Sequence, residues 1–365
     1  MGRLEQLYAE QGQSPWLDNL RRDWLDNGEL ARWLERGVRG VTSNPTIFQK
    51  AMTSSDAYEA DFARLIGEGR PVLDAYWEMV IADIQRALAL LEPIHRQSHG
   101  QDGFVSVEVA PSLALDTEGT IGAARGLSRR IAADNLFVKI PATEAGLPAI
   151  TTMIAEGCSV NVTLIFGLER YDAVIDAYLS GLEQRSGDLS AVSSVASFFV
   201  SRVDTEVDRR LDAIGSPEAL ELRGRAAIAQ ARAAYVLFNE RFSGPRWERL
   251  ADRGARLQRP LWASTSTKNP AYPDTLYVDE LIGPNTVNTI PDATLADFED
   301  HGTVARTLDR DPAEAAATLD RLRQVGIDMA DVARVLEEEG VRAFVQSFDD
   351  LVAGLETTAA TLASR

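Results

Sequence analysis

The chain alternates short apolar segments with longer segments of helical spacing, and this alternation limits its fold more than any other feature. Eight apolar segments predict strands, and a predicted helical segment follows each of them. The predicted strands cover residues 16–17, 38–42, 104–109, 136–140, 159–166, 193–204, 259–264 and 287–291. No hairpin turn joins two of them, so a parallel sheet is expected. Eight such units favour an α/β protein closed into a (β/α)8 TIM barrel over an open doubly wound sheet.

The remaining segments are predicted to form additional helices outside the barrel. We expect a single domain over residues 1–365, with a helical insertion at about 53–100 after the second strand and further C-terminal helices at about 311–362. Hydrophobic residues make up 45% of the chain, which is enough for a large core. The sequence contains neither GxGxxG nor GxxxxGK[ST], so a nucleotide-binding loop is not expected to organise the fold.

The net charge and the cysteine content limit the classes of binding partner and the cellular compartment that are expected. The net charge of −18 argues against nucleic acid and anionic membranes as partners, because both require basic surface. Residues 1–12 are polar and charged and no apolar run approaches about 18 residues, so neither a signal peptide nor a membrane span is predicted. Cys158 is the one cysteine and cannot form an intramolecular disulfide, which fits the cytoplasm.

Histidines are scarce and give little support to a metal site. His95 and His99 have i, i+4 spacing in a stretch that is predicted to be a polar loop, and His301 is remote in sequence. No third ligand accompanies the pair, so we predict a solvated loop without a metal.

Lysine is rare in this chain: of 37 lysines and arginines, only Lys50, Lys139 and Lys268 are lysines. Lys139 stands near the end of the apolar run 136–140, which predicts a buried strand. In water near pH 7.5 only ~0.1% of a lysine is neutral. A nucleophilic lysine needs its pKa lowered by roughly 3 units, about 4 kcal/mol, and burial can supply this. The alternative is a lysine that extends from the strand end to solvent.

Two carboxylates accompany other predicted strands. Asp18 follows the first strand at a junction with a helix, where it could be a helix N-cap, an acid/base group or both. Glu108 shares a strand face with Ser106 and Ala110, and a half-buried carboxylate is costly unless it is paired or protonated. A structural ion pair and a catalytic role therefore remain open for Glu108.

More polar residues stand at or just beyond predicted strand ends. They are Asn44, Asn161, Thr163, Ser197, Arg202 and Lys268. The carboxyl ends of barrel strands converge on one face, where active sites lie. Ser43 or Asn44 is also expected to cap a helix that begins at Pro45. Arg202 and Lys268 follow strands six and seven, near the usual phosphate site of barrels, although Arg202 could instead pair with Asp204 or Asp208 and Lys268 could be an ordinary loop lysine.

These residue types together indicate Schiff-base chemistry. A neutral lysine can attack a ketone, and the resulting iminium can accept electrons when a carbon–carbon bond breaks. Such a reaction needs proton transfer to and from the substrate, for which Asp18 and Glu108 are candidates.

Five motifs carry a resemblance to a known family. They are GVTSNPTIF at 40–48, SVEV at 106–109, FVKIPAT at 137–143, NVTLIF at 161–166 and VASFFVSR at 195–202. In this order, on successive predicted strands, they resemble transaldolases of the longer bacterial branch over nearly the whole chain. The resemblance implies a transferase of aldehyde or ketone residues in the non-oxidative pentose phosphate pathway. It would move a dihydroxyacetone unit from sedoheptulose 7-phosphate to glyceraldehyde 3-phosphate, giving erythrose 4-phosphate and fructose 6-phosphate.

The same resemblance implies roles for individual residues. Lys139 would form the Schiff base, Asp18 would be the acid/base at the cleaved C3–C4 bond, and Glu108 and Thr163 would orient a catalytic water. The implied substrate-binding residues are Asn44, Asn161, Ser197 and Phe199 for the carbon chain and Arg202, Ser266 and Lys268 for the phosphate. Other branches carry arginine at the position of Lys268. The implied partners are small-molecule sugar phosphates, no cofactor is implied, and monomer or homodimer stays open.

Three rival functions agree less well with the sequence. A fructose 6-phosphate aldolase releases the three-carbon unit to water, but such relatives are much shorter and carry tyrosine at the position of Phe199. A metal-dependent phosphosugar isomerase or epimerase would need His, Asp or Glu ligands at strand ends. A non-catalytic phosphate-binding barrel would explain Arg202, but not a buried Lys139 beside Glu108.

Overall fold

The computed structural model describes residues 1–363, and in this range the eight predicted strands close into a parallel barrel in sequence order. The strands are β1 Gln13–Leu17, β2 Gly40–Thr42, β3 Phe104–Glu108, β4 Leu136–Pro141, β5 Val160–Ile165, β6 Ser194–Phe199, β7 Gln258–Ala263 and β8 Thr286–Ile290. Pairing of β1 with β8 from Gln13↔Thr286 to Leu17↔Ile290 closes the ring. The predicted (β/α)8 TIM barrel is confirmed.

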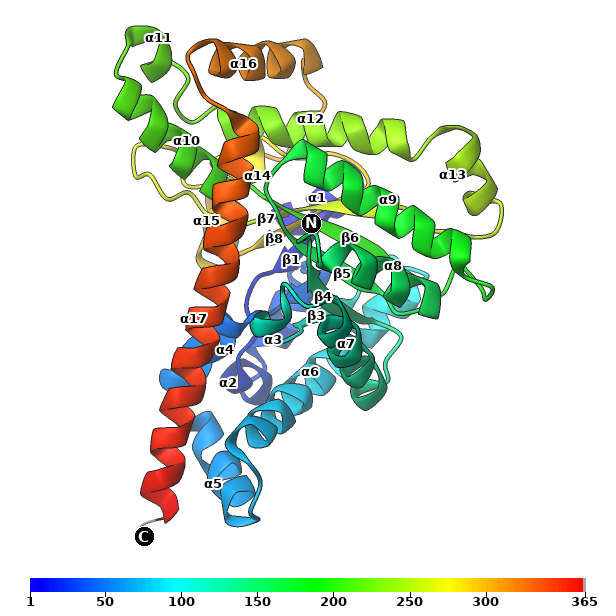
Figure 1. Ribbon diagram of the computed structural model, residues 1–365, viewed down its shortest axis with the longest axis vertical. Helices are drawn as coiled ribbons and strands as arrows, with labels where there is room; N and C mark the ends of the chain where they lie inside the picture. The colour runs from blue at the N-terminus through cyan, green and yellow to red at the C-terminus, as the bar shows by residue number, and fades with distance from the viewer. Residues whose placement is uncertain (364–365) are drawn as a thin grey trace.

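Helices surround the barrel and extend beyond it (Figure 1). The helices up to β6 are α1 Arg3–Gln11, α2 Arg22–Asp26, α3 Glu29–Glu35, α4 Pro45–Thr53, α5 Glu59–Gly67, α6 Val72–Gln97, α7 Thr117–Ile131, α8 Gly146–Glu156 and α9 Leu168–Gln184. Those after β6 are α10 Ser201–Ile214, α11 Pro217–Leu220, α12 Ala226–Arg241, α13 Gly244–Ala251, α14 Leu276–Asp279, α15 Asp292–His301, α16 Pro312–Gln324 and α17 Met329–Ala363. No helix among the described residues is long and apolar enough to cross a membrane.

Two local predictions were wrong. His95 lies in the last turn of α6 instead of a solvated loop, and its Nδ1 is 2.8 Å from the carbonyl oxygen of Asp102. The predicted sixth strand, 193–204, is shorter because the chain turns into α10 at Ser201. Both errors are at element ends, where apolar periodicity carries little information.

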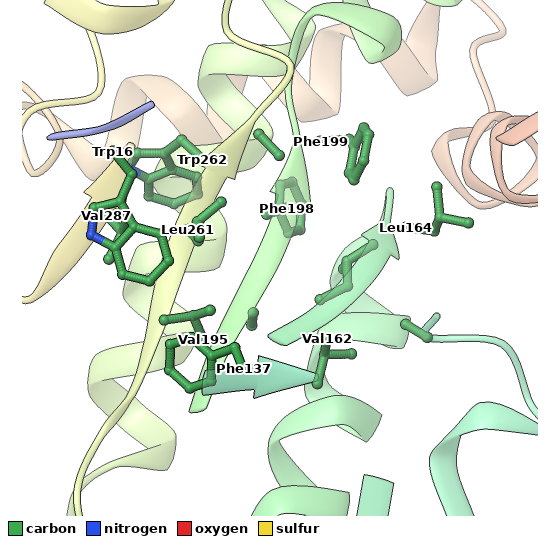
Figure 2. Close-up of a cluster of buried hydrophobic side chains, with 14 of the residues drawn as sticks. Trp16, Phe137, Val162, Leu164, Val195, Phe198, Phe199, Leu261, Trp262 and Val287 are labelled. Atoms are coloured by element: carbon green, nitrogen blue, oxygen red, sulfur yellow. The ribbon is translucent and has the colours of Figure 1, made fainter. Parts of the chain in front are cut away.

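Large side chains fill the barrel interior. The ring centres of Phe104 and Phe137 are 4.1 Å apart, and the ring centre of Trp16 is 6.0 Å from that of Phe137. A Cβ on Gly40 would lie 2.4 Å from the Trp16 indole, so only glycine lets β2 approach this ring. Figure 2 shows Trp16 and Phe137 together with aliphatic side chains from later strands, Val195, Leu261 and Val287. This packing closes the interior below the strand ends.

The long C-terminal helix α17 runs along the side of the molecule (Figure 1). It packs against α4, α10 and β5. Its Gly340 lies close to β5, since a Cβ there would be 3.0 Å from the Leu164 side chain. Residues near the end of the sequence are thereby brought to the carboxyl ends of the strands.

Candidate active site

Lys139 lies in the barrel beside a carboxylate. Glu108 and Asn161 are its register partners on the neighbouring strands β3 and β5. Its Nζ is 3.2 Å from Glu108 Oε2 and donates a 3.1 Å hydrogen bond to the carbonyl oxygen of Ser43. Lys139 is 5% exposed and Glu108 is 7% exposed. The alternative in which Lys139 extends to solvent is therefore wrong.

Burial changes the acidity of Glu108. It raises the pKa of this carboxyl, while the positive charge of Lys139 and their hydrogen bond act in the opposite direction. Tyr76 of α6, in the predicted insertion, lines a small space behind Glu108 together with Phe348 of α17. These rings keep water from that side, which strengthens the pairing of Glu108 with Lys139.

Asp18 follows β1 at the same face of the barrel. Its Oδ1 accepts a 2.8 Å hydrogen bond from the hydroxyl of Thr42, which is in turn 2.6 Å from the hydroxyl of Thr289. Burial raises the pKa of Asp18, against the lowering effect of Lys139 and of the Thr42 hydrogen bond. The alternative in which Asp18 caps a helix is wrong, because α2 begins only at Arg22. A partly buried acid of raised pKa is suited to proton transfer.

The amide of Asn161 is occupied at both ends. Its Nδ2 donates to Ser106 Oγ at 3.1 Å, and its Oδ1 accepts from Ser197 Oγ at 2.7 Å. Asn161 is fully buried and Ser197 lines the open cavity above it. In this conformation Asn161 positions Ser197, and Ser106 is a supporting residue that the sequence did not identify.

Asn44 both caps a helix and lines the cavity, as its sequence context indicates. Its Oδ1 accepts a 2.9 Å hydrogen bond from the backbone N–H of Ile47, so the predicted cap of the helix that begins at Pro45 is confirmed. The amide Nδ2 of Asn44 is left to donate to a ligand in the cavity that this residue lines.

Thr163 presents a hydroxyl without a partner. The residue is fully buried, and its Oγ1 makes no hydrogen bond among the described residues although it lines the cavity. The strand register shifts between Val162 and Ile165, and Leu164 has a φ of 60°. Such bulges redirect side chains and occur beside active sites. The hydroxyl is therefore available for a water or a substrate oxygen.

A cavity of about 520 Å³ opens among these residues, a size suited to a small organic ligand. The predicted site residues that line it are Asp18, Asn44, Lys139, Thr163, Ser197, Phe199, Arg202, Ser266 and Lys268. Glu108 and Asn161 lie behind this lining. The structure thus brings together the residues that the strand-end rule selected.

Cations gather at one part of the cavity. Lys268 Nζ donates a 2.6 Å hydrogen bond to Ser266 Oγ, and the Arg202 guanidinium lies 5.4 Å from the Phe199 ring centre. Burial, Arg202 and Lys50 all lower the pKa of Lys268. Within residues 1–363 neither Arg202 nor Lys268 has an acidic group within ion-pair distance. An anion between them would relieve this repulsion.

The alternative in which Arg202 pairs with an acid of its own helix is wrong. Asp204 Oδ2 accepts a 2.8 Å hydrogen bond from the Tyr277 hydroxyl, and Asp208 Oδ2 accepts one of 2.6 Å from the Tyr272 hydroxyl. Both tyrosines follow β7, on the segment that carries Lys268. The two contacts fix that segment to α10 and leave the guanidinium of Arg202 free for a ligand.

Comparison with known proteins agrees with this geometry. The family model described as Transaldolase/Fructose-6-phosphate aldolase matches residues 15–355. The chain belongs to this family. A transaldolase of Parafrankia sp. (strain EAN1pec) is 54% identical over 346 residues, 93% of this chain and 94% of the relative. Transaldolases of Thermobifida fusca (strain YX) and Mycolicibacterium smegmatis (strain ATCC 700084 / mc(2)155) are 52% and 51% identical, over 96% and 93% of this chain and 97% and 93% of theirs.

The resemblance to transaldolases is confirmed, but some lining residues of this family member were not identified from sequence. Thr42 and Thr289 stand near strand ends, so the rule that selected Asn44 could also have found them. From the sequence, Lys50 was named only as one of the three lysines and was given no role. Phe344 of α17 also lines the cavity, and nothing in its local sequence places it there.

Asp204 supplies a test of its own burial between α10 and the segment after β7. Burial raises its pKa from 3.8 to about 6, a difference that corresponds to about 3 kcal/mol. A raised carboxyl pKa favours the folded state fully below pH 3.8, and this contribution is lost as the pH rises through about 6. Asp204→Asn cannot titrate, so its unfolding free energy relative to wild type should rise by about 2–3 kcal/mol between about pH 4 and pH 8. Urea unfolding of both proteins at both pH values measures this change. If the difference in unfolding free energy between variant and wild type is the same at the two pH values, the raised pKa of Asp204 is contradicted.

Proposed function

We propose that this chain catalyses the transaldolase reaction, the reversible transfer of a dihydroxyacetone unit from sedoheptulose 7-phosphate to glyceraldehyde 3-phosphate. The products are erythrose 4-phosphate and fructose 6-phosphate. The observation that carries the proposal is a buried Lys139 with its Nζ 3.2 Å from Glu108 Oε2, in a cavity that also contains Arg202 and Lys268. The amine can react with the ketone of the substrate, and the cations can bind its phosphate.

Imine formation comes first. The neutral Lys139 amine attacks the C2 carbonyl of the donor ketose, and the resulting carbinolamine loses its hydroxyl as water to give the iminium. Glu108 takes the proton that the Lys139 ammonium loses before it attacks, and returns it through an intervening water to the departing hydroxyl, for which its raised pKa suits it. The unpartnered Thr163 hydroxyl holds this water. Glu108 and Thr163 thus allow the former carbonyl oxygen of the ketose to leave as water.

Cleavage of the carbon–carbon bond follows. Asp18 takes the proton of the C4 hydroxyl, the C3–C4 bond breaks, and its electron pair moves into the iminium to leave an enamine on Lys139. The aldehyde product departs. In the second half the enamine attacks the acceptor aldehyde, Asp18 returns the proton to the new hydroxyl, and water releases the ketose. Every proton and electron pair is accounted for without a cofactor.

The other lining residues hold the substrate in this scheme. Asn44 Nδ2 and Ser197 Oγ bind hydroxyl groups of the three-carbon unit, and Asn161 fixes Ser197 through its 2.7 Å hydrogen bond. Phe199 forms an apolar wall beside the Lys139 adduct. Arg202, Ser266 and Lys268 bind the phosphate, in agreement with the absence of acidic partners within residues 1–363. Orientation of this kind lowers the entropic part of the barrier.

The nearest alternative is fructose 6-phosphate aldolase activity, because the family description includes both enzymes. The similar proteins named above are all called transaldolases. Phe199 also lacks the hydroxyl with which a tyrosine could protonate the enamine and release dihydroxyacetone. Isomerisation or epimerisation would give no role to a lysine nucleophile. We place the reaction in the cytoplasm and the non-oxidative pentose phosphate pathway.

A product assay separates transfer from release. With sedoheptulose 7-phosphate and glyceraldehyde 3-phosphate together, erythrose 4-phosphate and fructose 6-phosphate should form in equal amounts, with free dihydroxyacetone below about 1% of turnover. Fructose 6-phosphate without an acceptor is the control and should give at most one equivalent of product per site, since the enamine has no aldehyde to attack. Continuous release of dihydroxyacetone in the control would establish an aldolase instead.

A further inference from the structure

Lys50, the third lysine of the chain, belongs to the wall of the candidate active site. It lies in the last turn of α4, whose first residue follows the Asn44 cap. Asn44, Ile47, Lys50 and Ser54 line the same cavity at spacings of three and four, so one face of α4 forms a continuous side of it. The wall begins at a predicted substrate contact and continues through Lys50.

The amino group of Lys50 is free. Within residues 1–363 it makes no hydrogen bond and has no acidic group within ion-pair distance. An exposed cation on the next helix behaves differently, since Arg64 of α5 has Glu68 within 2.9 Å. Position near a helix C-terminus alone would stabilise any cation slightly, but it does not require one that faces a cavity.

Lys50 is also electrostatically close to the predicted phosphate ligands. Its charge and that of Arg202 both lower the pKa of Lys268, so the three cations repel one another. The chain carries a net charge of −18, yet among the described residues no carboxylate pairs with any of the three. An arrangement of unpaired like charges around a cavity is stabilised when an anion enters it.

We propose that Lys50 is a third cationic contact for the phosphate group of the sugar phosphate substrate, which it binds from the α4 side of the cavity. The inference rests on the proposed function for the identity of the anion. A phosphate ester carries a charge of about −1.5 to −2 at pH 7 and three strong acceptor oxygens. Arg202 and Lys268 can match that charge, but they leave acceptor capacity on the three oxygens for the flexible Lys50 ammonium, which has three donors.

The test uses the full chain and compares Lys50→Ala with Lys50→Arg. With fructose 6-phosphate as donor and erythrose 4-phosphate as acceptor, Lys50→Ala should raise KM for the donor about fivefold to tenfold and keep kcat within about twofold. Its Ki for inorganic phosphate as a competitive inhibitor should rise by a similar factor. Lys50→Arg retains the charge and should stay within about twofold of wild type in both quantities. Gln49→Ala, on the same helix but outside the cavity lining, is the matched control.

The proposal for Lys50 and the proposed function can fail independently of each other. Unchanged KM and Ki in Lys50→Ala would overturn the inference, and so would a fall in kcat at constant KM, which would make Lys50 part of the chemistry. Titration with inorganic phosphate followed by ³¹P NMR needs no turnover. It therefore decides on Lys50 even if the wild-type chain transfers no three-carbon unit, a result that would contradict the proposed function alone.

Discussion

Replacement of Lys139 by arginine is expected to lower kcat by at least about 10⁴-fold, because a guanidinium keeps its proton and cannot form an imine. The substitution retains a positive charge beside Glu108, which is 3.2 Å from Lys139 Nζ in the wild type. A buried carboxylate is thus not left without a partner, and the fold should persist. Steady-state kinetics, with circular dichroism to confirm folding, measures the effect.

Lys268→Arg is the matched control, since it makes the same exchange at the second lysine of the cavity. Binding of phosphate needs charge and donors, which arginine supplies. We expect kcat to be retained and KM to change by no more than about tenfold, roughly 1.4 kcal/mol. A comparable loss of kcat in both variants would show that Lys268 takes part in the chemistry.

Asp18→Asn is expected to lower kcat by about 10²–10⁴, the usual contribution of a positioned acid/base. An amide can still accept the 2.8 Å hydrogen bond from Thr42, so the local geometry should be kept while the proton acceptor is lost. Imine formation at Lys139 should continue, because Asp18 acts at the later cleavage step. Single-turnover trapping of the imine separates the two steps.

Asp292→Asn provides the control for Asp18. Asp292 lines the same cavity and its carboxylate is 3.4 Å from the Asn19 amide, but the proposed scheme assigns it no proton. We expect its kcat to stay within about threefold of wild type. Wild-type turnover in a folded Asp18→Asn would refute the acid/base assignment.

Apolar periodicity was sufficient to predict the barrel, because buried parallel strands are short runs of apolar residues separated by helices. The extent of each element was harder to predict. The alternative in which Asp18 caps a helix failed because three further residues precede α2, and the predicted strand 193–204 was too long because α10 begins at Ser201. Neither boundary is marked by a glycine or proline at that point.

The candidate site was predictable where strand geometry determines it. Strand ends of a barrel converge, so Lys139, Thr163 and Ser197 could be assigned to one cavity before any distance was known. The orientation of individual side chains could not be predicted in this way. The 2.7 Å bond that occupies Asn161 and the position of Lys50 on the cavity face of α4 depend on packing between elements distant in sequence. Phe344 reaches the site only because α17 packs against β5 and α4.

Borohydride trapping tests the central claim most directly. The full chain is incubated with fructose 6-phosphate, reduced with borohydride and digested, and the modified lysine is located by mass spectrometry. A reduced imine is stable, so its position identifies the nucleophile. The account predicts a label on Lys139, which is 5% exposed, and none on the exposed Lys50 or Lys268. A label found mainly on Lys50 or Lys268, or no label in an active preparation, would contradict it.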